Sequence, residues 1–189
     1  MTRSLRTDPP PIRAARRAGG VGAIRVVPAR AGFLHPATRR DIRELLAFFG
    51  PLAVYGLQSV ELRQAVDTGP TGGRWLIGRL HVPGRVVLYE QPCPPWVIRE
   101  ISAPALERLR SAGATLEVAA AVTRVHWPGE TLRDFVLFDG LMHEIGHHLV
   151  QHHRGKRSMR VMRTADHERY AEAFAAECRL AWAARKSHR

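Results

Sequence analysis

Hydrophobic residues recur every three to four positions in four segments of the chain, which is the period of an amphipathic helix. In residues 38–50, Thr38 and Asp41 have the spacing of a capping box, and Gly50 ends the segment. The other segments are residues 103–112, 131–153 and 165–184, and Thr131 with Asp134 is the expected cap of the third. The residues expected to face the core are Ile42, Leu45, Leu46, Phe49, Leu106, Leu109, Leu132, Phe135, Phe138, Met142, Leu149, Val150, Ala171, Phe174, Ala175 and Leu180.

Between residues 52 and 91, short runs of β-branched and aromatic residues are separated by glycine and proline, which is typical of strands. The best strands are residues 59–62, 74–77 and 85–89, and a turn at 81–84 predicts that the last two form a hairpin. Residues 115–127 alternate in a way that favours one further strand, although their alanines also suit a helix. Together the elements predict an α+β fold.

The first 32 residues differ from the rest because they are rich in arginine and poor in acidic residues. A transit peptide has this composition, but the prolines at residues 9–11 interrupt the helix that such a peptide forms. We therefore expect a flexible basic arm at residues 1–32 and one domain at residues 33–189, with order beginning near Pro36. No apolar run has the roughly 18–20 residues of a membrane span, and the two cysteines form no disulfide framework, so a soluble cytoplasmic protein is expected.

The net charge of +12 suggests an anionic partner such as nucleic acid, because clustered cations release counterions from a phosphate backbone. Codon bias explains the same charge, since Lys156 and Lys186 are the only lysines and the other cations are arginines. The charge gathers in the arm and in residues 154–163, and no interleaved aromatic residues or nucleic-acid-binding motif accompanies it. Nucleic acid therefore stays an alternative partner.

The chemistry of the chain centres on the segment His143-Glu144-Ile145-Gly146-His147. Two histidines four residues apart lie on one face of a helix, and zinc in hydrolases takes three protein ligands and one open position. Glu144 projects about 100° away around the helix, where it reaches a water on the metal and not the metal itself. The alternative is a histidine-rich helix surface without metal, but His143 and His147 lie at the edge of the apolar stripe. Gly146 within the helix, where glycine costs about 1 kcal/mol, indicates a close backbone approach.

A third ligand is expected from the helix at residues 165–184, which carries Glu168 and Glu172 on one face. Asp166 and His167 are the nearest rivals to Glu168, because helix registers read from sequence slip by a residue or two. A solvated acidic surface facing arginines is the alternative for this helix.

The two segments together resemble the glutamate-type zincin metallopeptidases, in particular the ImmA/IrrE-type and prenyl-protein endopeptidase-type peptidases. The resemblance covers His143 to His147 and the run Glu168-Arg169-Tyr170-Ala171-Glu172-Ala173-Phe174-Ala175. It implies a zincin-like fold, in which a small mixed or antiparallel sheet packs against the active-site helix and a second C-terminal helix. It also implies Glu168 as the third zinc ligand and Glu172 as a hydrogen-bond acceptor for a liganding histidine, where the family more often has aspartate or asparagine.

These residues predict a zinc-dependent endopeptidase acting on a protein or peptide, with Glu144 as the general base. A donor for the oxyanion is also needed, and Tyr170 is the first candidate, followed by His126, His167 and Tyr89. If residues 115–127 form an exposed edge strand, they offer an edge for an extended peptide. The alternative is a non-catalytic interaction module with the same fold, associated with nucleic acid through the basic arm.

Overall fold

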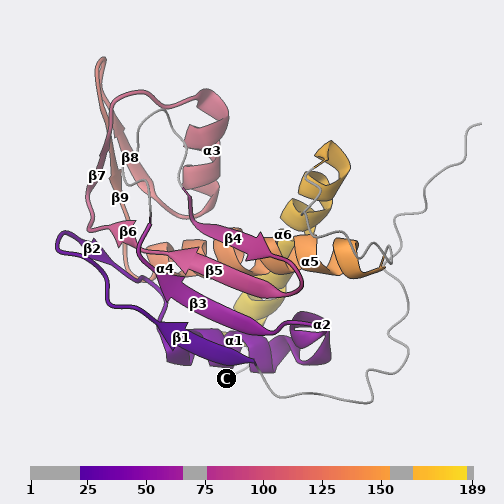
Figure 1. Ribbon diagram of the computed structural model, residues 1–189. Helices are drawn as coiled ribbons and strands as arrows, with labels where there is room; N and C mark the ends of the chain where they lie inside the picture. The colour runs from indigo at the N-terminus through magenta and orange to yellow at the C-terminus, as the bar shows by residue number, and fades with distance from the viewer. Residues whose placement is uncertain (1–21, 66–75, 154–163, 187–189) are drawn as a thin grey trace, which may run out of the picture.

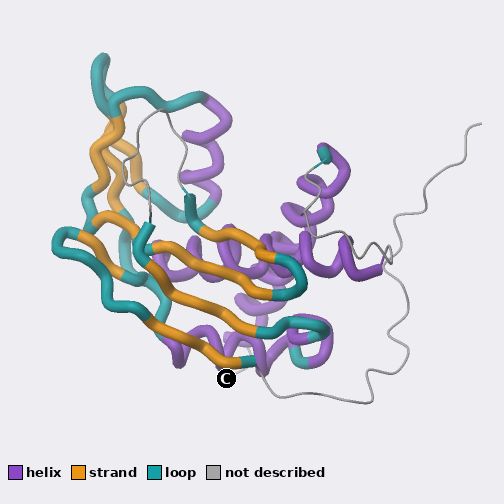
Figure 2. The backbone as a smooth tube through the Cα atoms, in the orientation of Figure 1, coloured by secondary structure: helices purple, strands orange, loops and turns teal. Residues whose placement is uncertain are grey.

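The computed structural model describes residues 22–65, 76–153 and 164–186, and these form the mixed α+β fold that the hydrophobic pattern predicts. Figure 1 shows a four-stranded sheet with helices behind it, and a smaller sheet with its own helix beside one end. Figure 2 traces the same backbone by secondary structure. The strands are β1 Ala23–Val26, β2 Phe33–Leu34, β3 Ser59–Arg63, β4 Gly78–His81, β5 Arg85–Tyr89, β6 Gln91–Pro92, β7 Trp96–Ile98, β8 Thr115–Val118 and β9 Thr123–His126. The helices are α1 Arg39–Phe49, α2 Pro51–Val54, α3 Ala103–Ser111, α4 Thr131–Phe135, the π-helix η1 Val136–Met142, α5 His143–His153 and α6 Ala165–Lys186.

The four-stranded sheet has the order β1-β3-β5-β4, with the first three strands parallel and β4 antiparallel to β5. Strand β1 lies inside the segment predicted to be a flexible arm, so the expectation that order begins near Pro36 is wrong. A four-residue strand carries little signal of its own, and only Ile24 of β1 is buried. Strand β1 is held in the sheet by its pairing with β3. Residues 1–21 of the predicted arm, and the basic segment 154–163, lie outside the described residues.

The predicted hairpin exists as β4 and β5, but its first strand is Gly78–His81 and not residues 74–77. Residues 74 and 75 lie outside the described residues, and Leu76 and Ile77 precede the strand. The turn sets the register of a hairpin, so residues next to the turn pair whatever their own β-propensity. Strand β4 therefore contains Gly78 and Arg79, for which β-propensity alone does not predict a strand.

Residues 115–127 form two strands where one was expected. Strands β8 and β9 pair antiparallel, and β7 completes a three-stranded sheet in the order β7-β9-β8. The turn between them lies at residues 119–122, where the amide of Ala119 donates to the carbonyl of Val122 at 2.9 Å. This turn contains three alanines and neither glycine nor proline, so the usual sequence marker of a reversal is missing. Strand β8 does form an edge of its sheet.

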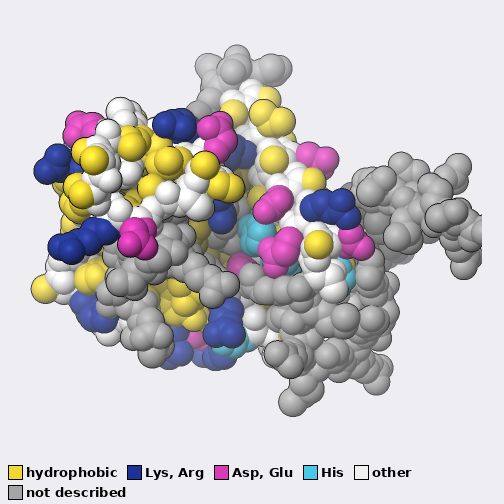
Figure 3. Space-filling view, turned by 90° about the horizontal axis from the view of Figure 1, so that it is seen from above, with side chains coloured by type: hydrophobic (Ala, Val, Ile, Leu, Met, Phe, Trp, Pro, Cys, Tyr) yellow, Lys and Arg dark blue, Asp and Glu magenta, His cyan; other side chains and the backbone are white. Residues whose placement is uncertain are grey.

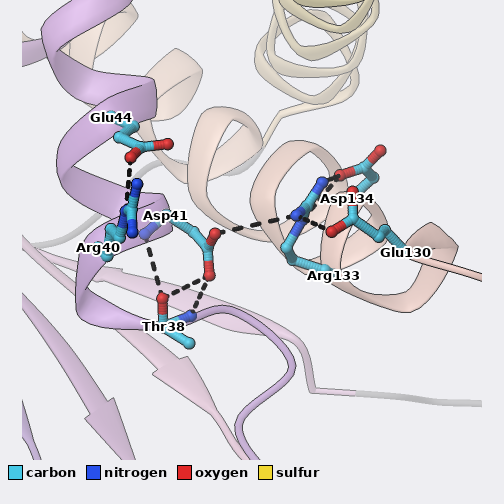
Figure 4. A network of polar contacts seen from close by, with 7 residues as sticks. All are labelled: Thr38, Arg40, Asp41, Glu44, Glu130, Arg133 and Asp134. Carbon is cyan, nitrogen blue, oxygen red and sulfur yellow. Dashed lines mark hydrogen bonds and ion pairs between the residues drawn. The ribbon is translucent and has the colours of Figure 1, made fainter.

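Helix α1 begins with the predicted capping box. The amide of Asp41 donates to Thr38 Oγ1, and the amide of Thr38 donates to Asp41 Oδ2 at 2.7 Å. Figure 4 shows that Asp41 also faces Arg133 of α4, whose guanidinium pairs with Glu130 and Asp134 as well. One carboxylate therefore caps α1 and links it to the helix that leads into the site.

The helix predicted at residues 131–153 is continuous but changes its winding. Its middle part is the π-helix η1, in which six of the seven residues are buried and only Asp139 is partly exposed. A period of 3.6 does not describe this part, because it passes between the sheet and α6. The predicted cap at Thr131 is wrong, since the helix begins after Glu130 and the Thr131 hydroxyl donates to the carbonyl of Pro128 at 2.7 Å.

Helix α6 buries Ala171, Phe174 and Ala175 as predicted, but Leu180 is 72% exposed and that prediction is wrong. The buried stripe continues through Cys178 and Trp182, which keep the helical spacing, whereas Leu180 lies on the opposite side of the helix. No helix within the described ranges has both the length and the apolar character that crossing a membrane requires.

Candidate metal centre

Three side chains from the two helices α5 and α6 bring their donor atoms together. The Nε2 atoms of His143 and His147 lie 3.1 Å apart, and Oε2 of Glu168 lies 3.4 Å from each of them. The two histidines are buried, and the Glu168 side chain is 35% exposed. In the view from above, histidine and acidic side chains come to the surface together near the middle of the molecule (Figure 3). The two histidines therefore lie inside the fold, and the group reaches solvent on the side of Glu168.

The separations of these three atoms fit a zinc ion. Zinc binds histidine nitrogen at about 2.0–2.1 Å and carboxylate oxygen at about 2.0–2.2 Å, so two ligands of a tetrahedral site lie roughly 3.3–3.5 Å apart. The observed separations of 3.1 Å and 3.4 Å are close to this value. Two imidazoles and one carboxylate are also the donor set of catalytic zinc sites that keep one position open.

Helix α5 presents both histidines from one face because they stand one turn apart. The transition from η1 to α5 occurs at His143, whose amide is shared between the carbonyls of Gly140 and Phe138. Local π-helix is frequent at functional sites, where it rotates the residues that follow. The apolar residues of η1 fix the rotation of α5, and hence the direction of the two imidazoles, by burial against the sheet and α6.

Helix α6 supplies Glu168 from its first turn. Its start is capped by Thr164, whose side-chain oxygen accepts from the amide of His167 at 3.3 Å, and whose carbonyl accepts from the amide of Glu168 at 3.0 Å. The first turn of a helix is a favourable position for an acidic side chain. Glu168, and neither Asp166 nor His167, lies with the two histidines in the group of possible metal ligands. Asp166 is exposed and pairs with Arg169.

Glycine at position 146 allows α5 and α6 to touch. A Cβ on Gly146 would lie 2.9 Å from the Cα of Ala171 and 3.3 Å from its Cβ. Real side chains essentially never come within 3.0 Å of such an atom. The close backbone approach that the glycine indicated is therefore confirmed, and its partner is the residue three positions after Glu168.

Glu144 is buried and lies against strand β4, the edge strand of the larger sheet. The amide of Leu80 donates to Glu144 Oε2 at 2.8 Å. Gly78 makes room for the side chain, because a Cβ there would lie 3.3 Å from Glu144 Cγ. A backbone donor and packing thus hold the carboxylate against β4.

The other residues predicted to take part lie in different places. Glu172 is exposed, and no contact with either histidine ligand is recorded for it in the described part of the chain. Tyr170 stacks on Phe174 with ring centroids 6.4 Å apart, and burial followed by the charges of Glu177 and Cys178 raises its pKa. Those neighbours lie about two to three helical turns further along α6 than Glu168.

The remaining oxyanion candidates come from three elements. His126 of β9 faces Glu117 of β8 at 3.2 Å, within the smaller sheet. Tyr89 packs with Val87 and Ala65 in a small cluster apart from the main core, whereas its strand neighbour Leu88 belongs to the main core with α5. Side chains alternate between the faces of a sheet, so Tyr89 points away from the metal centre. His167 is buried and adjoins Glu168 in sequence.

Sequence reasoning missed the surroundings of Glu144. Leu80 acts through its backbone amide, which carries no residue-specific signal. Gly78 did carry a sequence signal, because glycine inside a strand often marks the close approach of another group. Ala171 also had a signal, as a small residue opposite a helical glycine, but only the packing of α5 on α6 shows which small residue it is.

Comparisons of this chain with models of protein families, with curated proteins and with solved structures found no match.

Proposed function

We propose that this protein is a zinc-dependent metallopeptidase with a zincin-like fold. The observation that carries the proposal is the triangle of donor atoms from His143, His147 and Glu168, with the buried carboxylate of Glu144 following the first ligand on α5. A structural role alone does not require two imidazole nitrogens at 3.1 Å from each other. At this distance one nitrogen can donate a hydrogen bond to the other, and a metal bound through both lone pairs would replace the shared proton.

The roles of the residues follow from their positions. His143, His147 and Glu168 would hold the metal, which when bound lowers the pKa of a coordinated water and polarises a carbonyl group. Glu144 is the general base: it accepts the proton of the attacking water and passes it to the leaving amine. The Leu80 amide fixes one oxygen of Glu144, so the carboxylate is directed before a substrate arrives. Preorganised groups of this kind lower the barrier because they do not need to reorient during the reaction.

A peptide is the substrate class that fits the edge of strand β4. Leu80 pairs with Val86 in the ladder, yet its amide donates to Glu144, so its N–H points away from β5. In an antiparallel sheet the N–H and C=O groups of one residue point to the same side, so the C=O of Leu80 also points away from β5. No described strand pairs with this outer edge. An extended peptide added there would run beside Glu144, whereas β8, the edge expected from sequence, belongs to the smaller sheet.

Zinc analysis tests the ligand set. Purified wild-type protein should contain one zinc per chain, and His147→Ala and Glu168→Ala should each lose it. Glu172→Ala is the matched control, because this exposed glutamate lies one turn from Glu168 on the same helix. Equal zinc content in wild type and Glu168→Ala would show that the ligand set is wrong.

Catalysis is tested with Glu144→Gln, which should bind zinc as wild type does and lose peptide hydrolysis. A peptide mixture from a digested proteome, read by mass spectrometry, serves as the substrate. Equal cleavage by wild type and Glu144→Gln would rule out Glu144 as the base. Zinc bound at one equivalent without any cleavage by wild type would instead favour a non-catalytic module.

A further inference from the structure

The four-stranded sheet has a second face, turned away from the helices. On the inner face, Val60 of β3 and Val86 and Leu88 of β5 join the main core. Side chains one position along must therefore point outward. The outward residues include Glu61, Val87 and Tyr89, which are themselves buried, and in Figure 1 this face of the sheet is turned toward the viewer, with the helices behind.

Arginines from all four strands lie on this outer face. Arg25 of β1, Arg63 of β3 and Arg85 of β5 surround Glu61, at 3.5, 3.5 and 4.0 Å from its carboxylate oxygens. Their side chains are 72%, 52% and 41% exposed, whereas that of Glu61 is 5% exposed. Arg79 of β4 stands opposite Val87 in the ladder, so it shares the same face and is exposed. We call these four residues the arginine face.

The charge on this face is not balanced by an equal number of carboxylates, unlike that of Arg40 and Arg110. Arg40 pairs with Glu44 and Arg110 with Glu107, one carboxylate for each cation. On the arginine face three guanidinium groups share the single carboxylate of Glu61, and no ion pair is recorded for Arg79 within the described residues. Burial lowers the pKa of His81 on the same face, and the charges of Arg85 and Arg79 lower it further, whereas those of Glu61 and Glu144 raise it.

The arrangement of these cations fits a chain of phosphates better than one small anion. Neighbouring strands are about 4.8 Å apart, so guanidinium groups on β1 and β4 are spread over roughly 14 Å of rigid sheet. A guanidinium group binds phosphate oxygens through two parallel hydrogen bonds. In Figure 3 basic side chains gather along the lower edge, which is the front of Figure 1.

We propose that the arginine face binds nucleic acid through its phosphate backbone. The proposal is independent of the peptidase function, because the face lies on the other side of the sheet from Glu144. Single-stranded and duplex nucleic acid share this backbone chemistry, and separate arms of the experiment distinguish them.

Binding is measured with the full chain by fluorescence anisotropy, using labelled 20-nucleotide single-stranded and duplex DNA over a series of salt concentrations. The variant is Arg25→Gln with Arg79→Gln, which leaves Arg63 and Arg85 beside the buried Glu61. Removing one arginine that binds a phosphate should reduce the slope of log K against log salt by about 0.7 for single strands or 0.9 for duplex. The double variant should therefore bind more weakly, with a slope that is smaller by about 1.4 or 1.8.

The matched control is Arg40→Gln with Arg110→Gln, which removes the same charge from exposed positions on α1 and α3. It should leave the slope unchanged, and circular dichroism should show equal folding of both variants. If the slope falls equally in the two double variants, or falls in neither, the arginine face is not the binding surface. Competition by poly-glutamate as effective as that by DNA would overturn the proposal in favour of an acidic protein partner.

Discussion

Gly146 of α5 and Ala171 of α6 lie in direct backbone contact, since a Cβ on the glycine would come within 2.9 Å of the alanine Cα. This contact joins the helix of the two histidines to the helix of the glutamate. Because Glu168 is three residues before Ala171, the distance between the helices at this point sets the distance between Glu168 Oε2 and the imidazoles. The spacing of the candidate metal site therefore rests on the absence of one methyl group.

Replacing Gly146 by alanine should weaken zinc binding. Alanine gains about 1 kcal/mol of helix propensity, but its methyl group meets a backbone atom, and overpacking of this kind costs about 1–3 kcal/mol. Relief requires α6 to move away from α5, which takes Glu168 with it. We expect at least a tenfold rise in the zinc dissociation constant, measured by competition with a chromophoric chelator.

Leu109→Ala is the control for a general loss of stability without any change at the metal site. Leu109 is fully buried in α3, on a different element from any of the proposed ligands. Its truncation should reduce the free energy of unfolding by about 2–5 kcal/mol and leave the zinc affinity unchanged. Similar zinc affinities for Gly146→Ala and wild type would contradict the role assigned to the helix contact.

A valine at position 78 should impair hydrolysis without releasing zinc. Its side chain would meet Glu144 Cγ and Leu88 Cδ2, which lie 3.3 and 3.2 Å from the position of a Cβ. The Glu144 carboxylate must then move away from the Leu80 amide, while the three proposed ligands keep their places. A displacement of about 1 Å at a catalytic group lowers rates by up to about 100-fold. Parallel measurement of zinc content and kcat tests this, and full activity in Gly78→Val would count against the position proposed for Glu144.

The sequence patterns predicted those elements whose stability is local. The capping box of α1 and the strand β5 are confirmed because their residues act within a few positions of each other. Strand β1 and the turn between β8 and β9 were missed because neighbours distant in sequence, or a turn of alanines, define them. The π-helix η1 was also missed, since it exists where a helix is buried on nearly every side and the 3.6-residue period no longer applies.

The candidate site was predictable to a similar extent. The spacing of His143 and His147 fixes one face of one helix, and the structure places Glu168 beside them. The position of Glu144 against β4 depends on a backbone amide 64 residues away in sequence, for which no local pattern exists. The exposed position of Glu172 has the same cause, because the packing of α6 on α5 decides which of its faces meets the site.

Asp139 should stabilise the fold as the charged centre of three elements. It lies on η1, where its carboxylate pairs with Arg108 of α3 at 3.3 Å and with Arg179 of α6. Its side chain is only 20% exposed, so screening by solvent is weak. Asp139→Asn should lower the free energy of unfolding by about 1–3 kcal/mol in urea titrations, because two charge-assisted hydrogen bonds lose their anion.

Glu44→Gln provides the comparison for Asp139→Asn. It also removes a carboxylate that pairs with an arginine, but this pair is exposed on α1, with side chains 87% and 45% exposed. Exposed pairs contribute little to stability. If both substitutions changed the free energy of unfolding equally, the ion pairs of Asp139 would stabilise the fold no more than an exposed pair does.

Cys178 should resist alkylation although Cys93 reacts. Burial within α6, followed by the charge of Glu177, raises the pKa of the Cys178 thiol to about 12, whereas Cys93 is exposed. Thiolate is the reactive form, so at pH 8 iodoacetamide should label Cys93 in the folded chain and both cysteines in urea. Mass spectrometry of the peptides gives the two labelling rates. Equal rates in the folded chain would contradict the buried position of Cys178.

The same shift has a consequence for stability at high pH. The thiol ionises near pH 9.0 in the unfolded chain and near pH 12 in the folded one. Since the folded-state pKa is the higher, the folded chain keeps its proton while the unfolded chain releases it. The contribution of this group is fully present below pH 9.0 and is lost as the pH rises toward 12. Urea titrations between pH 8 and 11 should therefore show a smaller loss of stability in Cys178→Ala than in wild type, and parallel curves for the two proteins would refute the shift.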